Sequence, residues 1–106
     1  MLKQVRVPFD DILFDPEEVG DMLTACMKRQ RKMRFVGAAA AEKCLIALFE
    51  DSPVKSSSEL LLAPFGSADP DEVGAEISQR FERNYLLRAS FRIQSKIWAL
   101  YEVEAD

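Results

Sequence analysis

A dense run of basic side chains lies between residues 28 and 34. Cations at this spacing could bind the phosphate groups of a nucleic acid or another anion. They also lie late in a predicted helix, where positive charge complements the carboxyl end of the helix dipole. Both interpretations stay open for the five cations of the run, which are Lys28, Arg29, Arg31, Lys32 and Arg34.

The other residue types give little support for catalysis. The sequence has no histidine, the side chain that most often acts as a general base near neutral pH. Its two cysteines, Cys26 and Cys44, form no CxxC pair and sit in apolar runs, so we expect buried, reduced thiols. The acidic residues at 10–11 and 69–72 lack the spacing of a calcium loop. We therefore expect a protein that is not an enzyme and that binds no metal or cofactor.

Two apolar runs give a more specific prediction. Residues 97–101 and 45–49 are apolar at successive positions, so strands there would be apolar on both faces. Two helices can cover only one face of a sheet, and a second copy of the protein or a protein partner would cover the other. The alternative is a sheet that curls and buries both faces within one chain. The candidate homodimer or partner interface consists of Trp98, Leu100, Tyr101, Ile46 and Leu48.

The elements that would position these residues come from an internal repeat. Residues 15–20 (DPEEVG) match residues 69–74 (DPDEVG), and residues 45–50 (LIALFE) match residues 97–102 (IWALYE). Self-similarity in one order along the chain indicates a duplicated unit, with two connections that are each two residues longer in the first copy. Further matched pairs are Pro8/Pro64, Leu23/Ile77, Met33/Leu87 and Arg34/Arg88.

Each copy predicts a helix followed by a hairpin. Asp15 and Asp69 are suitable N-caps, and a proline follows each of them at the first helical position. Aromatic and β-branched residues predict strands at 89–94 and 97–104. The matching segment 38–43 has high helix propensity, but the repeat favours strand–turn–strand there. We expect the strands that precede the helices at 5–9 and 60–65.

Small residues stand at two notable places. Gly20 and Gly74 lie one turn inside the predicted helices, where glycine costs about 1 kcal/mol relative to alanine. Their recurrence favours close packing of each helix on a neighbour, and the alternative is plain inheritance through the duplication. Gly37 and the alanines at 38–41 would form a strand of small side chains, which leaves room for a ligand or for another backbone.

These elements predict an α+β fold, a tandem duplication of a β-α-β-β unit with a mostly antiparallel sheet and two helices on one face. We expect a single domain over 1–106, with repeats at about 1–51 and 59–106 joined by a Ser/Pro linker. In element order each unit resembles the strand–helix–strand–strand modules called SHS2 domains. Such modules occur in duplicated form in small-molecule-binding, GyrI-like proteins and singly in protein-interaction roles. The resemblance is one of topology, so it assigns no role to any residue.

Three functions follow from these patterns. The first is a non-catalytic regulator, inhibitor or adaptor that acts through the apolar sheet face as a homodimer or with a protein partner. The second is a small-ligand sensor with a pocket between the repeats. The third is nucleic-acid binding through residues 28–34, which a formal net charge of −4 disfavours for the chain as a whole. No run reaches the roughly 20 apolar residues of a membrane span, so we expect a cytoplasmic protein.

Overall fold

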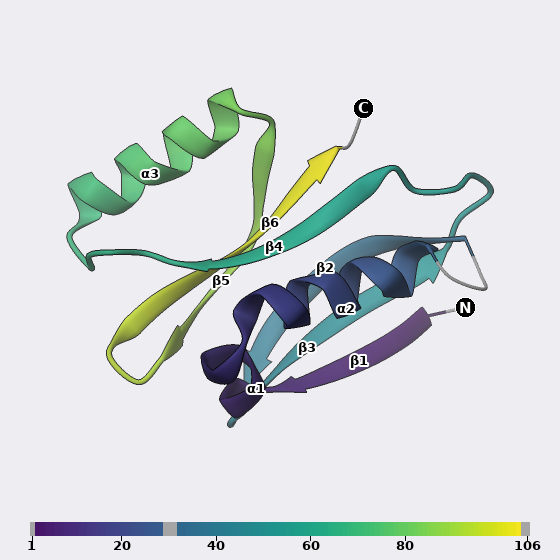
Figure 1. Ribbon diagram of the computed structural model, residues 1–106, viewed down its shortest axis with the longest axis horizontal. Coiled ribbons are helices and arrows are strands. Elements are labelled where there is room, and N and C mark those ends of the chain that lie inside the picture. The colour runs from purple at the N-terminus through teal and green to yellow at the C-terminus, as the bar shows by residue number, and fades with distance from the viewer. Residues whose placement is uncertain (1, 29–31, 105–106) are drawn as a thin grey trace.

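The strands form two antiparallel three-stranded sheets, each built from one half of the chain (Figure 1). The computed structural model describes residues 2–28 and 32–104. Sheet A contains β1 (Leu2–Pro8), β2 (Met33–Ala41) and β3 (Cys44–Asp51), and sheet B contains β4 (Ser58–Pro64), β5 (Tyr85–Ile93) and β6 (Lys96–Glu104). The helices are α1 (Phe9–Phe14), α2 (Pro16–Lys28) and α3 (Pro70–Glu82).

The two halves have the same plan. In each sheet the last strand of the half lies in the centre, which gives the orders β1-β3-β2 and β4-β6-β5. This arrangement confirms the predicted α+β class and is consistent with a duplicated unit. The expectation of one sheet with two helices on one face is corrected, because the strands form two sheets and the two long helices contact different strands. Helix α2 packs mainly on β4 of the other half, whereas α3 packs on β5 of its own half.

Both long helices begin where the sequence predicts. The carboxylate of Asp15 accepts a hydrogen bond from the Glu18 amide at 3.0 Å, and that of Asp69 accepts one from the Glu72 amide at 3.2 Å. Each bond satisfies an amide that has no partner within the first turn of its helix. Neither long helix, nor the short α1, has the length and apolar character needed to cross a membrane, as far as the described residues extend.

The alanine-rich segment is a strand, as the repeat favoured. Residues 38–41 complete β2 and pair with β3, and Lys43 follows with a positive φ of 63° in the two-residue turn. Each β hairpin also has an irregularity at the corresponding place, between Phe35 and Gly37 and between Leu87 and Ala89. Strand pairing rather than intrinsic propensity therefore determines the conformation of this segment.

Of the two connections predicted to be longer in the first half, the one between strand and helix is present, and the one between helix and hairpin includes residues 29–31, which lie outside the described residues. Residues 9–15 separate β1 from α2, whereas residues 65–69 separate β4 from α3. The extra length of the first connection accommodates α1, which the sequence did not predict. Within the hairpins, Met33 pairs with Asp51 and Tyr85 pairs with Val103. Met33 thus corresponds to Tyr85 rather than to Leu87, and the matched arginines, Arg34 and Arg88, are two positions out of register.

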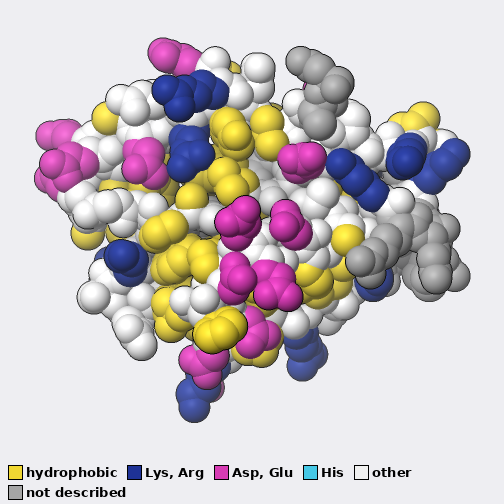
Figure 2. Space-filling model, in the orientation of Figure 1, with side chains coloured by type: hydrophobic (Ala, Val, Ile, Leu, Met, Phe, Trp, Pro, Cys, Tyr) yellow, Lys and Arg dark blue, Asp and Glu magenta, His cyan; other side chains and the backbone are white. Residues whose placement is uncertain are grey.

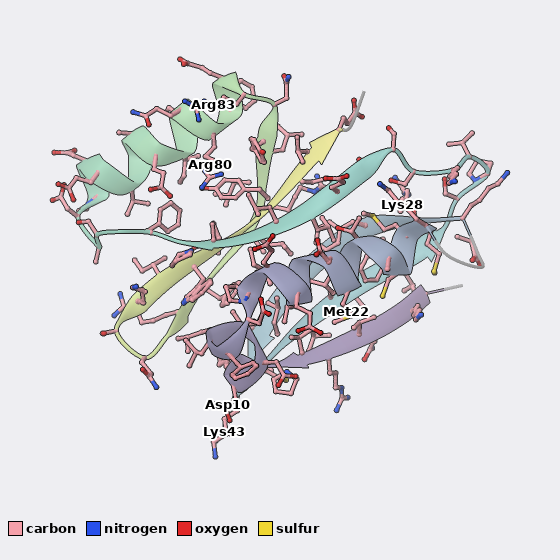
Figure 3. All side chains as sticks on the ribbon, viewed as in Figure 1. Asp10, Met22, Lys28, Lys43, Arg80 and Arg83 are labelled. Carbon is pink, nitrogen blue, oxygen red and sulfur yellow. The ribbon has the colours of Figure 1, made fainter. Side chains whose placement is uncertain are left out.

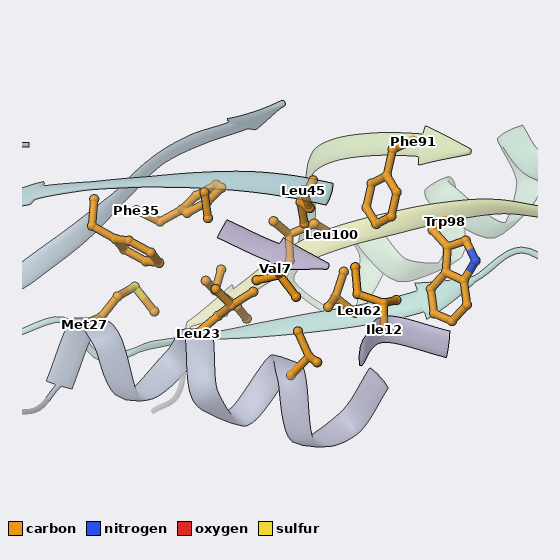
Figure 4. Close-up of a cluster of buried hydrophobic side chains, with 14 of the residues drawn as sticks. Val7, Ile12, Leu23, Met27, Phe35, Leu45, Leu62, Phe91, Trp98 and Leu100 are labelled. Atoms are coloured by element: carbon orange, nitrogen blue, oxygen red, sulfur yellow. The ribbon is translucent and has the colours of Figure 1, made fainter. Parts of the chain in front are cut away.

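Two hydrophobic clusters hold the chain together. The main core lies between sheet A, α1, α2 and one face of sheet B, and Figure 4 shows side chains from all four around Leu23 and Val7. The second core lies between α3 and the other face of sheet B, around Tyr101 and Ala99. Sheet B is therefore covered by its own chain on both faces, which explains why β6 is apolar at successive positions.

A close helix–strand contact joins the two halves. A Cβ atom added to Gly20 of α2 would lie 3.1 Å from the carbonyl oxygen of Leu60 on β4. One turn further along α2, the hydroxyl of Thr24 accepts a hydrogen bond from the Leu60 amide at 2.9 Å. Another turn on, the Lys28 ammonium lies 3.9 Å from the Glu59 carboxylate. This stripe covers the outer edge of β4, so the packing role suggested for Gly20 is present, whereas Gly74 has open space around it.

Candidate functional site

Three of the five predicted interface residues are buried within the chain. Trp98 and Leu100 point into the main core (Figure 4), and Tyr101 belongs to the second core. Their exposed fractions of 5%, 0% and 0% leave no free surface for a partner. The prediction of an interface at these three positions is thus corrected, because sheet A covers one face of β6 and α3 covers the other. The alternative of burial within one chain holds for sheet B.

Tyr101 has polar neighbours despite its burial. The Arg80 guanidinium of α3 lies 5.3 Å from the centre of the Tyr101 ring and 5.4 Å from that of Tyr85, in a cation–π arrangement (Figure 3). Burial raises the pKa of the Tyr101 hydroxyl, the charge of Glu76 raises this pKa further, and the charge of Arg80 lowers it. The Tyr101 hydroxyl has no hydrogen-bond partner among the described residues.

Replacement of Tyr101 by phenylalanine is expected to stabilise the fold by about 1 kcal/mol at pH 7, because it removes a buried hydroxyl without a partner. The pKa of Tyr101 in the folded chain lies above the ordinary value of 10.0, so the unfolded chain ionises first as the pH rises. Wild-type stability should therefore fall above about pH 10, and Y101F should lose less. Urea unfolding at pH 7 and pH 11 measures both effects, and a less stable Y101F at pH 7 would contradict them.

The other two predicted interface residues lie on a face that the chain leaves open. Ile46 and Leu48 of β3 are partly exposed, whereas their neighbours Leu45, Ala47 and Phe49 are buried in the main core. This alternation gives sheet A one buried face and one open face. We call the open side the outer face of sheet A. It comprises Gln4 and Arg6 of β1, Gly37, Ala39 and Ala41 of β2, and Cys44, Ile46 and Leu48 of β3.

The outer face has an apolar centre and small side chains along one side. Ala39 pairs with Ile46, and Ala41 pairs with Cys44, so β2 contributes only methyl groups there. Both cysteines are free, but Cys44 and Cys26 are only partly buried, which corrects the expectation of full burial. A partly apolar, partly exposed sheet face of this kind suits contact with another protein better than it suits enclosure of a small molecule.

The basic run is less free than its composition suggests. Lys28 lies near Glu59, and the Arg34 guanidinium pairs with the Glu50 carboxylate of β3. Lys32 is exposed, while Arg29 and Arg31 lie outside the described residues. Two cations of the second half are also engaged, because Arg80 packs on the two tyrosine rings and Arg88 pairs with Glu102 at 3.1 Å. The described part of the run therefore forms no continuous cationic surface.

A groove of about 460 Å³ lies between the two halves of the chain. Helix α2 forms one wall and β4 the other, with Tyr85 and Val103 at one end. Three carboxylates line or flank it, those of Glu17, Asp21 and Glu59. Figure 2 shows acidic side chains gathered on this side of the molecule, over α2. The sequence predicted a pocket between the repeats but not its acidic character. That character comes from Glu17 and Asp21 on the exposed side of α2, the helix that packs between the two halves.

The described residues contain no cluster of three or more cysteine, aspartate or glutamate side chains that could hold a metal ion. Comparison with protein-family models, with curated proteins and with solved structures gave no match to this chain.

Proposed function

We propose that the protein is a small, non-catalytic interaction protein that regulates or adapts another protein by binding it through the outer face of sheet A. The observation that supports this proposal is the partial exposure of Ile46 and Leu48 at the centre of a strand whose other face is fully buried. The corresponding face of sheet B, with Trp98 and Leu100, is covered by the rest of the chain. Sheet A has no such cover among the described residues.

The surface favours an acidic amphipathic helix of another protein as the occupant. Small side chains at Gly37, Ala39 and Ala41 allow a helix to approach the sheet closely. Arg6 and Lys43 are exposed near this strip and would attract carboxylates on the flanks of such a helix. Two free cysteines fit a reducing compartment, and the cytoplasm is the compartment that we propose.

Replacement of Leu48 by aspartate should abolish partner binding, because it places a charge at the apolar centre of the outer face. The fold should stay intact, because the Leu48 side chain is partly exposed and the core is formed by its buried strand neighbours. The measurement is affinity capture with the tagged protein, followed by titration of each captured protein against the purified chain. The matched control is Val54→Asp, which places the same charge at a side chain that is 66% exposed in the linker. A partner that binds both variants equally, or loses affinity for V54D instead, would exclude the outer face as the site.

The groove between α2 and β4 supports a second candidate, a sensor of small cationic ligands. Its volume of about 460 Å³ falls within the range of ligand sites, and the Glu17, Asp21 and Glu59 carboxylates would attract positive charge. Spermidine is a suitable probe because its amines are spaced along a narrow chain. Binding to the native state should raise the thermal midpoint with ligand concentration, and Asp21→Asn should reduce the rise. An unchanged midpoint at millimolar spermidine would remove this candidate in favour of the interaction protein.

A further inference from the structure

The contact that seals β4 is made by a stripe along α2 with a spacing of four residues. Gly20, Thr24 and Lys28 follow one another on a single side of the helix. Each makes one element of the contact, namely the close approach to Leu60, the hydrogen bond to the Leu60 amide and the ion pair with Glu59. Edge strands expose unpaired backbone groups, and a helix laid against the edge is one way to cover them.

Helix α3 carries a stripe with the same spacing, and its residues are exposed. Gly74, Ser78 and Glu82 have the spacing of Gly20, Thr24 and Lys28, each 54 residues further along the chain. All three are exposed, and a Cβ atom added to Gly74 would have no neighbour within 4 Å. The apolar side of α3, with Val73 and Ile77, already packs on sheet B. The stripe therefore lies on a side of α3 that no described part of its own chain covers.

The matching edge is β1. The Phe9 amide donates to the Lys43 carbonyl at 3.0 Å, and the Phe65 amide donates to the Ile97 carbonyl at 2.8 Å. These phenylalanines follow the matched prolines Pro8 and Pro64 and bond to the central strand in the same way, although two positions out of register along it. Gln4 precedes Phe9 by the same five residues that separate Leu60 from Phe65. Antiparallel strands alternate bonded and free amides, so the Gln4 amide points away from β3, as the Leu60 amide points away from β6. Edge β1 thus presents at Gln4 the donor that Thr24 satisfies on β4.

The charges at the two contacts are exchanged. Lys28 of α2 faces Glu59 of β4. The positions that match these in the sequence repeat are Glu82 of α3 and Lys3 of β1, both of which are exposed. In each pair the helix residue and the strand residue carry opposite charges. The helix residue is basic in the first pair and acidic in the second. This exchange makes α3 electrostatically suited to β1.

We propose that α3 covers β1 of a second copy of this chain. In this contact Gly74 lies against the backbone at Gln4. The Ser78 hydroxyl accepts a hydrogen bond from the Gln4 amide, and the Glu82 carboxylate pairs with the Lys3 ammonium. Within one chain α3 and sheet A lie on opposite faces of sheet B (Figure 1). Helix α3 therefore cannot reach β1 of its own chain, and the β1 edge that it covers belongs to a second copy. Two chains related by a twofold axis would make this contact twice. The inference concerns α3 and the backbone edge of β1, which adjoins the outer face of sheet A at Gln4 but does not include Ile46 and Leu48.

Replacement of Gly74 by leucine tests the contact without unfolding the chain, because Gly74 is exposed and leucine favours a helix. We expect the wild-type chain to dimerise in sedimentation equilibrium over about 1 µM to about 1 mM. The dissociation constant of G74L should be at least about 100-fold higher, since the substitution changes both of the symmetry-related α3–β1 contacts. The control is Gln79→Leu, which places the same leucine side chain at an exposed position off the stripe and should leave the dissociation constant unchanged. Circular dichroism confirms that each variant is folded.

Charge exchange gives a second readout. Lys3→Glu and Glu82→Lys should each weaken dimerisation several-fold, and the double variant should restore it because the ion pair is re-formed with reversed signs. A wild-type chain that stays monomeric up to about 1 mM, or a G74L variant that dimerises as well as wild type, would overturn the proposal. Dimerisation that is lost in L48D but retained in G74L would place the second copy on the outer face of sheet A and would also overturn it.

Discussion

Replacement of Trp98 by alanine should lower the free energy of unfolding by about 3 to 5 kcal/mol, the range found when a large aromatic side chain is removed from a core. Trp98 is 5% exposed, and it lies in the main core with Leu100 and Phe91 beside it. Domains of this size have a total stability of about 5 to 15 kcal/mol, so this loss is a large fraction of it. Urea unfolding followed by far-ultraviolet circular dichroism measures the change without depending on tryptophan fluorescence.

The control for W98A is Phe14→Ala, which removes an aromatic side chain that is 89% exposed. We expect its effect on stability to stay within about 0.5 kcal/mol. If W98A instead remained as stable as wild type but failed to bind a partner, Trp98 would be a surface residue, and the burial of this face within the chain would be refuted.

Replacement of Gly20 by leucine should destabilise the protein by about 3 kcal/mol or more, because its side chain must displace the backbone of β4. The nearest atom to a Cβ at this position is the Leu60 carbonyl oxygen, which a flexible side chain cannot accommodate by moving aside. The matched variant is Gly74→Leu in dilute solution, where the helix gains up to about 1 kcal/mol in propensity and meets no neighbour.

Thermal and urea unfolding of the two glycine variants at low micromolar concentration give the comparison directly. Opposite signs, with G20L less stable and G74L more stable than wild type, are the expected result. Equal effects at Gly20 and Gly74 would mean that the two helices are packed alike, and the difference between the two halves described above would be lost.

The sequence allowed the elements to be predicted better than their mutual arrangement. The alanines at 38–41 favour a helix by propensity, and only comparison with the second copy indicated a strand there. Helix α1 (Phe9–Phe14) was missed because it begins without a side-chain cap, directly after a strand. Neither local propensity nor capping residues signalled it, since its position depends on burial of Ile12 in the main core.

The candidate site was predictable only in part, for a physical reason. The apolar pattern of β3 and β6 shows that both faces of each strand carry apolar side chains, but not which of these faces another layer of the chain covers. Sheet A and α3 cover the two faces at Trp98 and Tyr101, whereas Ile46 and Leu48 keep an open side. This difference arises from the relation between the two halves, which no local pattern encodes. The glycine, hydroxyl and charge spacing shared by α2 and α3 was visible in the sequence, and it became informative once the α2 contact was known.

The central claim is that the edge strand β1 of the first half is open, whereas the edge strand β4 of the second half is covered by α2. Amide hydrogen exchange by nuclear magnetic resonance tests it most directly at two residues, Leu60 and Gln4. The account predicts slow exchange of the Leu60 amide, which is bonded to Thr24, at every protein concentration. It predicts fast exchange of the Gln4 amide in dilute solution and slower exchange as the concentration rises and a second copy covers β1. A Gln4 amide that exchanges as slowly as that of Leu60 in dilute solution would contradict it.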